Sequence, residues 1–216
     1  MYDCARLVVS AEMMVPPISD SFGGSIPALV PNDTAFEQFG GLDTSFGLTP
    51  GALKLDDGVE RYVIESLGGS ALAFNVTCRS EMRPDARNRV QLAEGTDPAG
   101  LPRLRASCVI ESDALRTVDD YLRYMGASLA SEGQGRLRID NEAIYSRVTG
   151  GGHTMGTTRM GNDSKTSVVD KDCRVHGYRN LYIAGSSVFT SGGYANPTLT
   201  IVALAARLSD HLVDVA

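Results

Sequence analysis

Residues 151–212 constrain the fold more than any other part of the chain. This stretch sets His153 in a glycine-rich turn, continues into a compact apolar run at residues 180–184, and ends in an Asn-Pro-Thr sequence ahead of a long segment with helical periodicity. The apolar run predicts a buried strand. Asn196 as an N-cap, with Pro197 at the first helical position, predicts a helix from about Pro197 to Asp214.

The upstream residues predict an antiparallel sheet. Residues 71–81 alternate and are rich in β-formers, residues 89–92 indicate a second strand, and residues 104–112 indicate a third strand after a turn at 96–102. Consecutive strands joined by short turns favour antiparallel pairing with one face exposed to water. Residues 1–60 are rich in glycine, proline and small polar residues, which indicates loops around short strands or a lid over a substrate site.

A helical period then replaces the alternation. Ser112 or Asp113 is suited to cap the start of this helix, and Gly133 lies shortly beyond its expected end. Residues 136–139 indicate a further short strand. The positions expected on the buried face of the helix are Leu115, Val118, Leu122, Met125 and Leu129.

Composition excludes several classes of function. The net charge is −6 and no basic cluster is present, which argues against nucleic acid and anionic membrane as partners. No apolar run approaches the roughly 18 residues of a membrane span, and the N-terminus is not organised as a signal peptide, so we expect a cytoplasmic protein. The four cysteines are too scattered for a zinc site or a disulfide scaffold, so we expect free thiols and no metal.

His153 is the only one of the three histidines with a suggestive setting. Glycines on both sides allow backbone to approach a flat ligand, and an imidazole that titrates near neutrality is suited to taking a proton from a hydroxyl. A hydrogen-bonded loop histidine is the structural alternative. The residues around it leave both explanations open.

Asn196 and the residues after the apolar run also have two explanations each. The Asn196 amide either caps its own helix, which the local sequence favours, or polarises a substrate oxygen. In both cases the helix N-terminus favours nearby negative charge. Gly185, Ser186 and Ser187 offer backbone amides and hydroxyls to a phosphate or sugar, or they form a plain turn. Arg159 either clamps a ligand or, as is more common for a loop arginine, is solvated or paired with a carboxylate. Asp170 and Asp172 have no partner at the spacing of metal ligands, and His176 and His211 are expected to be structural.

Taken in their order along the chain, these motifs resemble those of the glucose–methanol–choline (GMC) family of FAD-dependent oxidoreductases. The resemblance is nearest to the pyranose-oxidase-like bacterial branch of this family. The resemblance covers about residues 60–216. The motifs that carry it are residues 153–161, 167–170, 174–177, 180–186 and 196–200, with residues 81–84, 88–90 and 100–102 upstream.

The resemblance implies a division of labour. His153 matches the histidine that accepts the alcohol proton while hydride passes to flavin N5, and Asn196 matches a second catalytic position. The start of the last helix would lie by the flavin pyrimidine edge, where the helix dipole stabilises an anionic reduced flavin. The implied cofactor is FAD, and its implied binding residues are Gly185, Ser186, Asn196, Pro197 and Thr198.

The chain also departs from the family pattern, because the sequence contains no G-x-G-x-x-G. The resemblance implies an α+β / α/β fold with two parts. Residues 1–145 would be a substrate-binding portion with an antiparallel sheet, loops and a helix. Residues 146–216 would be the C-terminal strand and helix of a Rossmann-like FAD-binding domain whose N-terminal half is missing. The implied partner is therefore an N-terminal FAD-binding subunit or segment, which makes the chain a subunit, a truncation or a fragment.

The implied function is FAD-dependent oxidation of a CH–OH group (EC 1.1 type) on a small alcohol or sugar, incomplete in the isolated chain. The alternative is a non-catalytic remnant or interaction subunit that retains the fold. The sequence leaves open which alcohol or sugar is used, whether the enzyme is an oxidase or a dehydrogenase, and the oligomeric state. Loops that select a substrate vary freely within one fold.

Overall fold

The computed structural model describes residues 7–15, 28–52, 58–146, 148–150 and 152–215. Within these ranges the chain forms two compact units. We call residues 7–80 and 112–149 the sheet unit, and residues 81–111 together with those from 150 onward the C-terminal unit. Each unit is therefore assembled from segments that are far apart in the sequence. The functional division at residue 145 stays a prediction.

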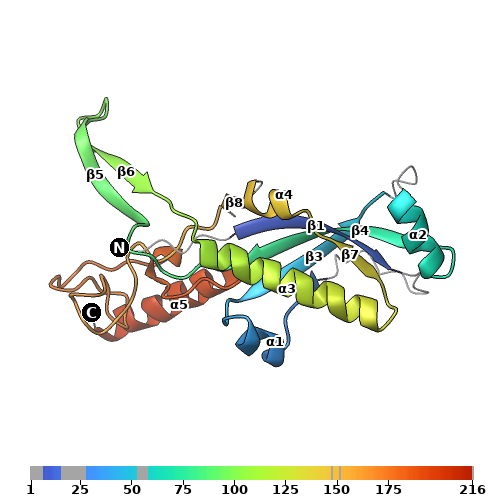
Figure 1. Cartoon of the computed structure of the whole chain (residues 1–216). Helices are drawn as coiled ribbons and strands as arrows, with labels where there is room; N and C mark the ends of the chain where they lie inside the picture. The colour runs from blue at the N-terminus through green and yellow to red at the C-terminus, as the bar shows by residue number, and fades with distance from the viewer. Residues whose placement is uncertain (1–6, 16–27, 53–57, 147, 151, 216) are drawn as a thin grey trace. The chain divides into compact units, whose positions relative to one another are not determined.

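The sheet unit is an antiparallel sheet covered by one long helix (Figure 1). Its strand order is β2-β3-β4-β1-β7, and β8 pairs with β1. The strands are β1 (Leu7–Val15), β2 (Ala28–Leu29), β3 (Thr44–Pro50), β4 (Leu72–Ser80), β7 (Arg136–Arg138) and β8 (Thr149–Gly150). The helices are α1 (Asp33–Gln38), α2 (Gly58–Ser66), α3 (Ser112–Ser131) and α4 (Asn141–Ser146).

The predicted alternation in β4 is confirmed. Phe74, Val76 and Cys78 are buried on one face of the strand, and Asn75 between them is exposed. Burial of alternate residues is the pattern of a sheet with one covered face.

The predicted helix is α3. Leu115, Val118 and Leu122 are buried, as the helical period predicts. Met125 and Leu129 are only half-buried, because they line a hollow of about 260 Å³ against α1, β2 and β3. Gly133 beyond the helix has a φ of 66°, and Gln134 N–H donates to Leu129 O, which ends the helix in a Schellman-type turn.

The strand pairing differs from the prediction. β4 pairs with β1 and β3, so that Val76 lies between Ala11 and Leu48. Both neighbouring strands come from residues 1–60, where the sequence indicated loops around short strands or a lid over a substrate site. The alternation in β4 shows which face is buried, but it contains no information about which distant strand lies beside it.

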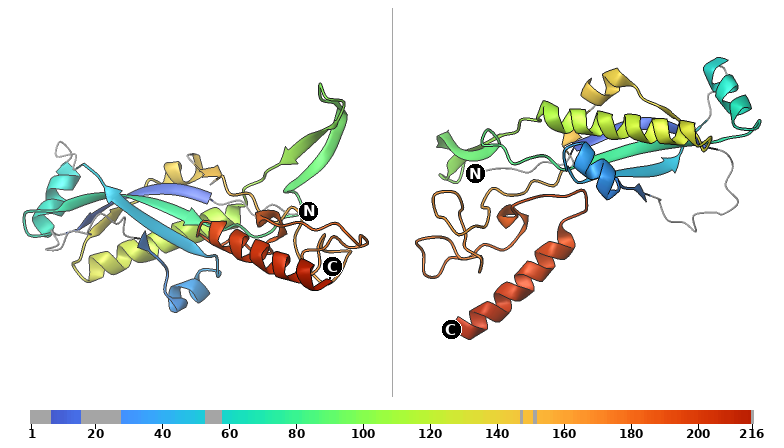
Figure 2. Two further views of the ribbon diagram at one scale, coloured as in Figure 1. Left: turned by 180° about the vertical axis from the view of Figure 1, so that it is seen from behind. Right: turned by 60° about the horizontal axis from the view of Figure 1, so that its bottom comes forward.

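The second and third predicted strands pair with each other and form a two-stranded ribbon in the C-terminal unit, separate from the larger sheet (Figure 2). It consists of β5 (Arg89–Thr96) and β6 (Pro102–Ser107). The predicted turn joins them, and Asp97 Oδ1 accepts hydrogen bonds from the N–H groups of Ala99 and Leu101. The ribbon does not pair with β4, which corrects the expectation of one continuous sheet.

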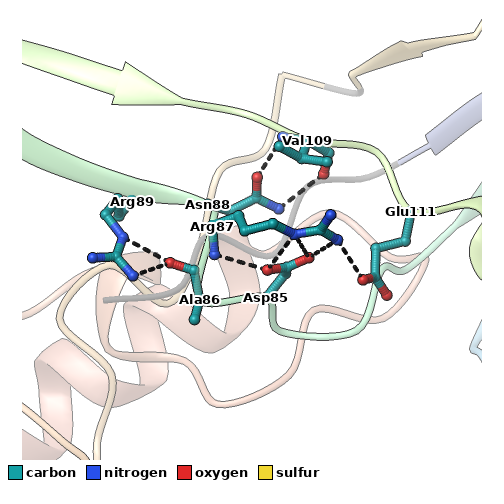
Figure 3. A network of polar contacts seen from close by, with 7 residues as sticks. All are labelled: Asp85, Ala86, Arg87, Asn88, Arg89, Val109 and Glu111. Carbon is teal, nitrogen blue, oxygen red and sulfur yellow. Dashed lines mark hydrogen bonds and ion pairs between the residues drawn. The ribbon is translucent and has the colours of Figure 1, made fainter.

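A polar network closes the base of the ribbon (Figure 3). The side chain of Asn88 is fully buried, donates to Val109 O at 3.0 Å and accepts from Val109 N–H. Beside it, Asp85 and Glu111 both pair with the Arg87 guanidinium. The Arg87 hydrogen bonds hold the pKa of Asp85 well below its usual range. Hydrogen bonds and an ion pair thus join the segment before β5 to the segment after β6.

The end of the chain contains one short helix and one long one. The 3₁₀ helix η1 (Ser186–Val188) lies within an irregular loop region, and α5 (Thr198–Val215) follows it. The strand predicted at residues 180–184 is absent, and only an isolated bridge joins Arg174 to Tyr182. A strand needs neighbours for its backbone groups, and the described residues of this region supply only isolated bridges.

Three of the four cysteines lie in the described residues, and all three are free thiols: Cys78, Cys108 and Cys173. Cys4 lies outside those residues. Over the same part of the chain, no group of three or more metal-ligating side chains forms, and none of the helices combines the length and apolarity needed to cross a bilayer.

Candidate active site

A backbone ladder joins the histidine turn to the segment around η1. Three N–H groups of residues 156–160 donate to three consecutive carbonyls, and one side-chain bond reinforces them, with Thr158 Oγ1 donating to Ser187 Oγ at 2.7 Å. The ladder holds the chain after His153 alongside the chain after Gly185. Its backbone bonds are Gly156 N to Ser186 O at 3.2 Å, Thr158 N to Ser187 O at 2.8 Å and Met160 N to Val188 O at 2.9 Å.

His153 lies at the start of this ladder and is half-buried. Thr154, the next residue, is exposed, and the chain then enters the interior at Met155 and Gly156, which are buried. Gly152 and Gly156 have φ values of 70° and 82°, a region that favours glycine, so the turn depends on both of them. Residue 151 of the predicted glycine run lies outside the described residues.

Gly185 and Ser186 lie beside the histidine turn, as two candidate cofactor contacts. Gly185 has a φ of 137°, and a Cβ added there would meet nothing within 4 Å, so its backbone borders open space. Ser186 Oγ donates to Thr154 O at 3.3 Å. The backbone at Gly185 is therefore open to close approach by a ligand, which a side chain would hinder.

Asn196, Pro197 and Thr198 lie at the start of α5. Ile201 N–H donates to Pro197 O at 3.0 Å, which is the first hydrogen bond of the helix. Pro197, whose carbonyl accepts this bond, is therefore the N-cap residue. The helix thus begins one residue later than predicted, and Asn196 lies just outside it. Boundary shifts of this size are common. Pro197 is buried, whereas Asn196 and Thr198 are exposed.

The remaining polar residues of this unit act within the structure. Arg159 Nε donates to Thr166 O at 2.7 Å. His176 Nε2 lies 2.9 Å from Ser167 Oγ and 3.1 Å from Gly161 O. Because Ser167 Oγ already donates to Asp163 O, the contacts fit a His176 tautomer that carries its proton on Nε2. His211 makes an edge contact with Tyr182.

Asp170 organises the turn that holds α5. Its carboxylate accepts the N–H groups of Asp172 and Arg174 at 3.0 Å each and pairs with the Arg174 guanidinium at 3.3 Å. Burial alone would raise the pKa of Asp170, but these hydrogen bonds and the Arg174 charge outweigh it and lower the pKa. In the same turn, Lys171 O accepts a hydrogen bond from the guanidinium of Arg207 in α5 at 2.6 Å.

Sequence reasoning missed two residues that support the candidate site, Thr158 and Glu81, and it gave Ser187 a different contact. Thr158 and Ser187 form the side-chain bond of the ladder, and Glu81 Oε2 accepts the N–H of Gly193 at 3.0 Å. No local pattern marks such pairs, because each joins positions distant in the sequence. Glu81 lies in one of the motifs that carry the family resemblance, although that motif does not indicate its contact.

Comparison with known families agrees with the fold and the motifs. The GMC oxidoreductase C-terminal family model matches residues 84–205, which is more than half of the chain. The chain therefore belongs to the GMC oxidoreductase family, and the sequence resemblance is confirmed. FAD is the cofactor of this family, as the resemblance implied.

Several curated relatives share this sequence in part. The fructose dehydrogenase large subunit of Gluconobacter japonicus is 28% identical over 191 residues, which are 85% of this chain and 31% of the relative. Pyranose 2-oxidase of Tricholoma matsutake is 39% identical over 62 residues, covering 29% of this chain and 11% of the relative. The chain thus spans less than a third of the length of these relatives.

Solved structures confirm the fold. Pyridoxine 4-oxidase from Mesorbium loti matches with a TM-score of 0.54 and 14% identity, over 96% of this chain and 43% of that one. Formate oxidase matches with a TM-score of 0.51 over 96% of this chain and 46% of the other. The combination of an antiparallel sheet with helices is therefore that of the C-terminal portion of these enzymes.

Proposed function

We propose that this chain supplies the proton-handling side of an FAD-dependent oxidoreductase that acts on a CH–OH group of a small alcohol or sugar. The observation that carries the proposal is the ladder between residues 156–160 and 186–188, which holds the chain beside His153 against the chain beside Gly185. A base and a cofactor-facing backbone must be neighbours if a hydroxyl is to lose its proton while its carbon loses a hydride.

In this proposal His153 accepts the hydroxyl proton. A half-buried imidazole in a turn fixed by the buried Met155 and Gly156 keeps its ring in a limited range of positions, which favours proton transfer. Asn196 orients the hydroxyl through its amide. FAD, when bound, supplies the hydride acceptor that the reaction requires. The products are a carbonyl compound and a protonated His153, which returns its proton to solvent.

The described residues fit a flavin cofactor. Gly185 borders open space, where its backbone can approach a bulky ligand, and the hydroxyl of Ser186 lies next to it. The N–H groups of Thr198, Leu199 and Thr200 precede the first helical hydrogen bond, which Ile201 makes, and a helix N-terminus of this kind favours negative charge. We propose Gly185, Ser186, Asn196, Pro197 and Thr198 as the residues of this chain that hold FAD.

We also propose that this site is completed by an N-terminal FAD-binding subunit or segment. The support comes from α5, in which none of the described residues is buried. One side, with Ile201, Leu204 and Leu208, is half-buried. The opposite side carries Leu199 at 82%, Val202 at 60% and Val213 at 77% exposure, spaced as one helix face. A helix that is apolar on opposite faces is typical of the interior of a larger domain.

A test of this function combines the chain with an FAD-binding half that contains G-x-G-x-x-G. We expect the assembled protein to show flavin absorbance. We also expect a sugar or alcohol to bleach this absorbance in the absence of oxygen. His153→Ala is expected to slow bleaching by about 10²- to 10⁴-fold, the usual contribution of a general base. His211→Gln, in the same unit but at the far end of α5, is the matched control and should bleach at the wild-type rate.

A non-catalytic interaction subunit is the second candidate function. It is favoured by the same exposed face of α5, which suits docking whether or not chemistry follows. Under this alternative the assembled complex would keep every activity unchanged in the His153→Ala variant. Equal bleaching rates in the wild type and His153→Ala would therefore reject catalysis by this chain.

A further inference from the structure

One long-range hydrogen bond ends beside the proposed catalytic asparagine. Glu81 Oε2 accepts the backbone N–H of Gly193 at 3.0 Å, across 112 residues of sequence. Both residues belong to the C-terminal unit. Gly193 precedes Asn196 by three residues, so this bond acts on the short loop that carries Asn196.

The loop that receives this bond has little local structure of its own. Residues 191–197 form no helix or strand, and two consecutive glycines, Gly192 and Gly193, lie at its centre. Gly193 has a φ of 66°, a region that glycine enters freely. Glycine backbone is also the most flexible, so such a loop samples many conformations unless a tertiary contact restricts it.

The segment that presents Glu81 is well anchored. Met82, the next residue, is 2% exposed, and Asn88 a few residues later is fully buried. Asn88 is bonded to Val109, and Asp85 is bonded to Arg87 in the network of Figure 3. The carboxylate therefore comes from a well-anchored part of the unit and bonds a loop that forms no helix or strand. A hydrogen bond to a charged acceptor is stronger than one between neutral groups, which suits this purpose.

We propose that Glu81 is a positioning residue, which holds the 191–197 loop so that the Asn196 amide faces the reacting hydroxyl. This inference rests on the proposed function, since it gives Asn196 a role in orienting substrate. It predicts that loss of the Glu81 acceptor leaves the fold and the proton acceptor in place but lets Asn196 leave its productive position. Small displacements of orienting groups are costly to a reaction rate.

The first arm of the test measures the loop directly, without activity. In the full chain carrying a nitrogen isotope label, hydrogen exchange of the Gly193 amide is compared among the wild type, Glu81→Ala and Glu81→Gln. We expect exchange to be about tenfold faster or more in Glu81→Ala, because the amide loses its acceptor. Glu81→Gln keeps an oxygen acceptor of the same length and should restore the protection. Glu94→Ala, an exposed glutamate in β5, is the matched control.

The second arm measures turnover in the complex with the FAD-binding half. Glu81→Ala is expected to lower kcat by about 10- to 100-fold while KM changes less than about threefold, because orientation acts mainly on the transition state. Glu81→Gln should recover most of the loss. If Glu81→Ala does not fold, Glu81→Asp replaces it, since the shorter side chain withdraws the carboxylate from Gly193 and predicts the same direction of change.

The outcomes separate this inference from the proposed function. Unchanged Gly193 exchange in Glu81→Ala, or an unchanged kcat in an active complex, overturns the positioning role. A wild-type complex that never reduces its flavin instead rejects the proposed function, and with it the catalytic purpose of the contact. A Glu81→Gln variant that is as impaired as Glu81→Ala also contradicts the inference, because both variants would then lose something other than the acceptor.

Discussion

Cys78 and Cys108 differ in access to water, the property that largely controls thiol reactivity. Cys78 is 1% exposed on the covered face of β4, and burial raises the pKa of its thiol. Cys108 is exposed. A thiolate is the reactive form, so the two residues should react at very different rates.

We therefore expect iodoacetamide at pH about 8 to alkylate Cys108 in the native chain at least about tenfold faster than Cys78. Peptide mapping by mass spectrometry measures both rates in one sample. The unfolded chain is the control, because there both cysteines should react alike. Native alkylation of Cys78 as fast as that of Cys108 would contradict the burial of β4 in the sheet unit.

At the scale of elements, the Asp170 turn joins the irregular loop region to α5. The turn contains the buried Cys173, whose φ of 65° is unusual for a residue other than glycine. In the same turn, the carbonyl oxygen of Lys171 accepts a hydrogen bond from the Arg207 guanidinium of α5. The hydrogen bonds of Asp170 hold this unusual backbone in place, so its carboxylate stabilises the connection to α5.

We predict that Asp170→Asn lowers the free energy of unfolding by about 1 kcal/mol at neutral pH. The lowered pKa of Asp170 means that its contribution is complete above the unfolded value near pH 4 and is lost as pH falls through the folded value. The wild type and the variant should therefore converge as pH falls below about 4. Urea unfolding at pH about 7 and about 3 measures this difference, and a gap that is the same at both pH values would count against it.

For the whole molecule, the outer face of α5 is the feature that most concerns assembly. Leu199, Val202 and Val213 place three large apolar side chains on one exposed stripe. Leu199 and Val202 are about one turn apart, whereas Val213 lies about three turns further along the same face, past Ser209 and Asp210. Exposed apolar side chains on one helix face are characteristic of interaction sites. A charge placed there should oppose docking while leaving the chain itself nearly unchanged.

Val202→Asp is predicted to weaken binding to the FAD-binding half by at least about tenfold, equivalent to about 1.4 kcal/mol, because a carboxylate would be buried without a partner. Tyr62→Asp, at a 72% exposed apolar position of α2, is the matched control and should bind as the wild type does. Titration calorimetry measures both affinities. Equal affinities of Val202→Asp and the wild type would show that the partner docks elsewhere.

Local pattern and motif order predicted the features that depend on neighbouring residues. The helical period predicted α3 with Leu115, Val118 and Leu122 inward, and the alternation of β4 predicted its covered face. The motif order from His153 to Asn196 predicted the family, which the family comparison confirmed. The roles of His153 and Asn196 stay predictions, because neither the fold nor the comparisons test them.

The fold shows which distant segments meet, which local pattern did not predict. It placed β1 and β3 beside β4, separated the β5–β6 ribbon from that sheet, and brought Glu81 to Gly193. It also replaced the strand predicted at residues 180–184 with isolated bridges. The physical reason is common to all four. Backbone pairing and long-range hydrogen bonds depend on partners far along the chain, and local propensity and periodicity report only on the segment that contains them.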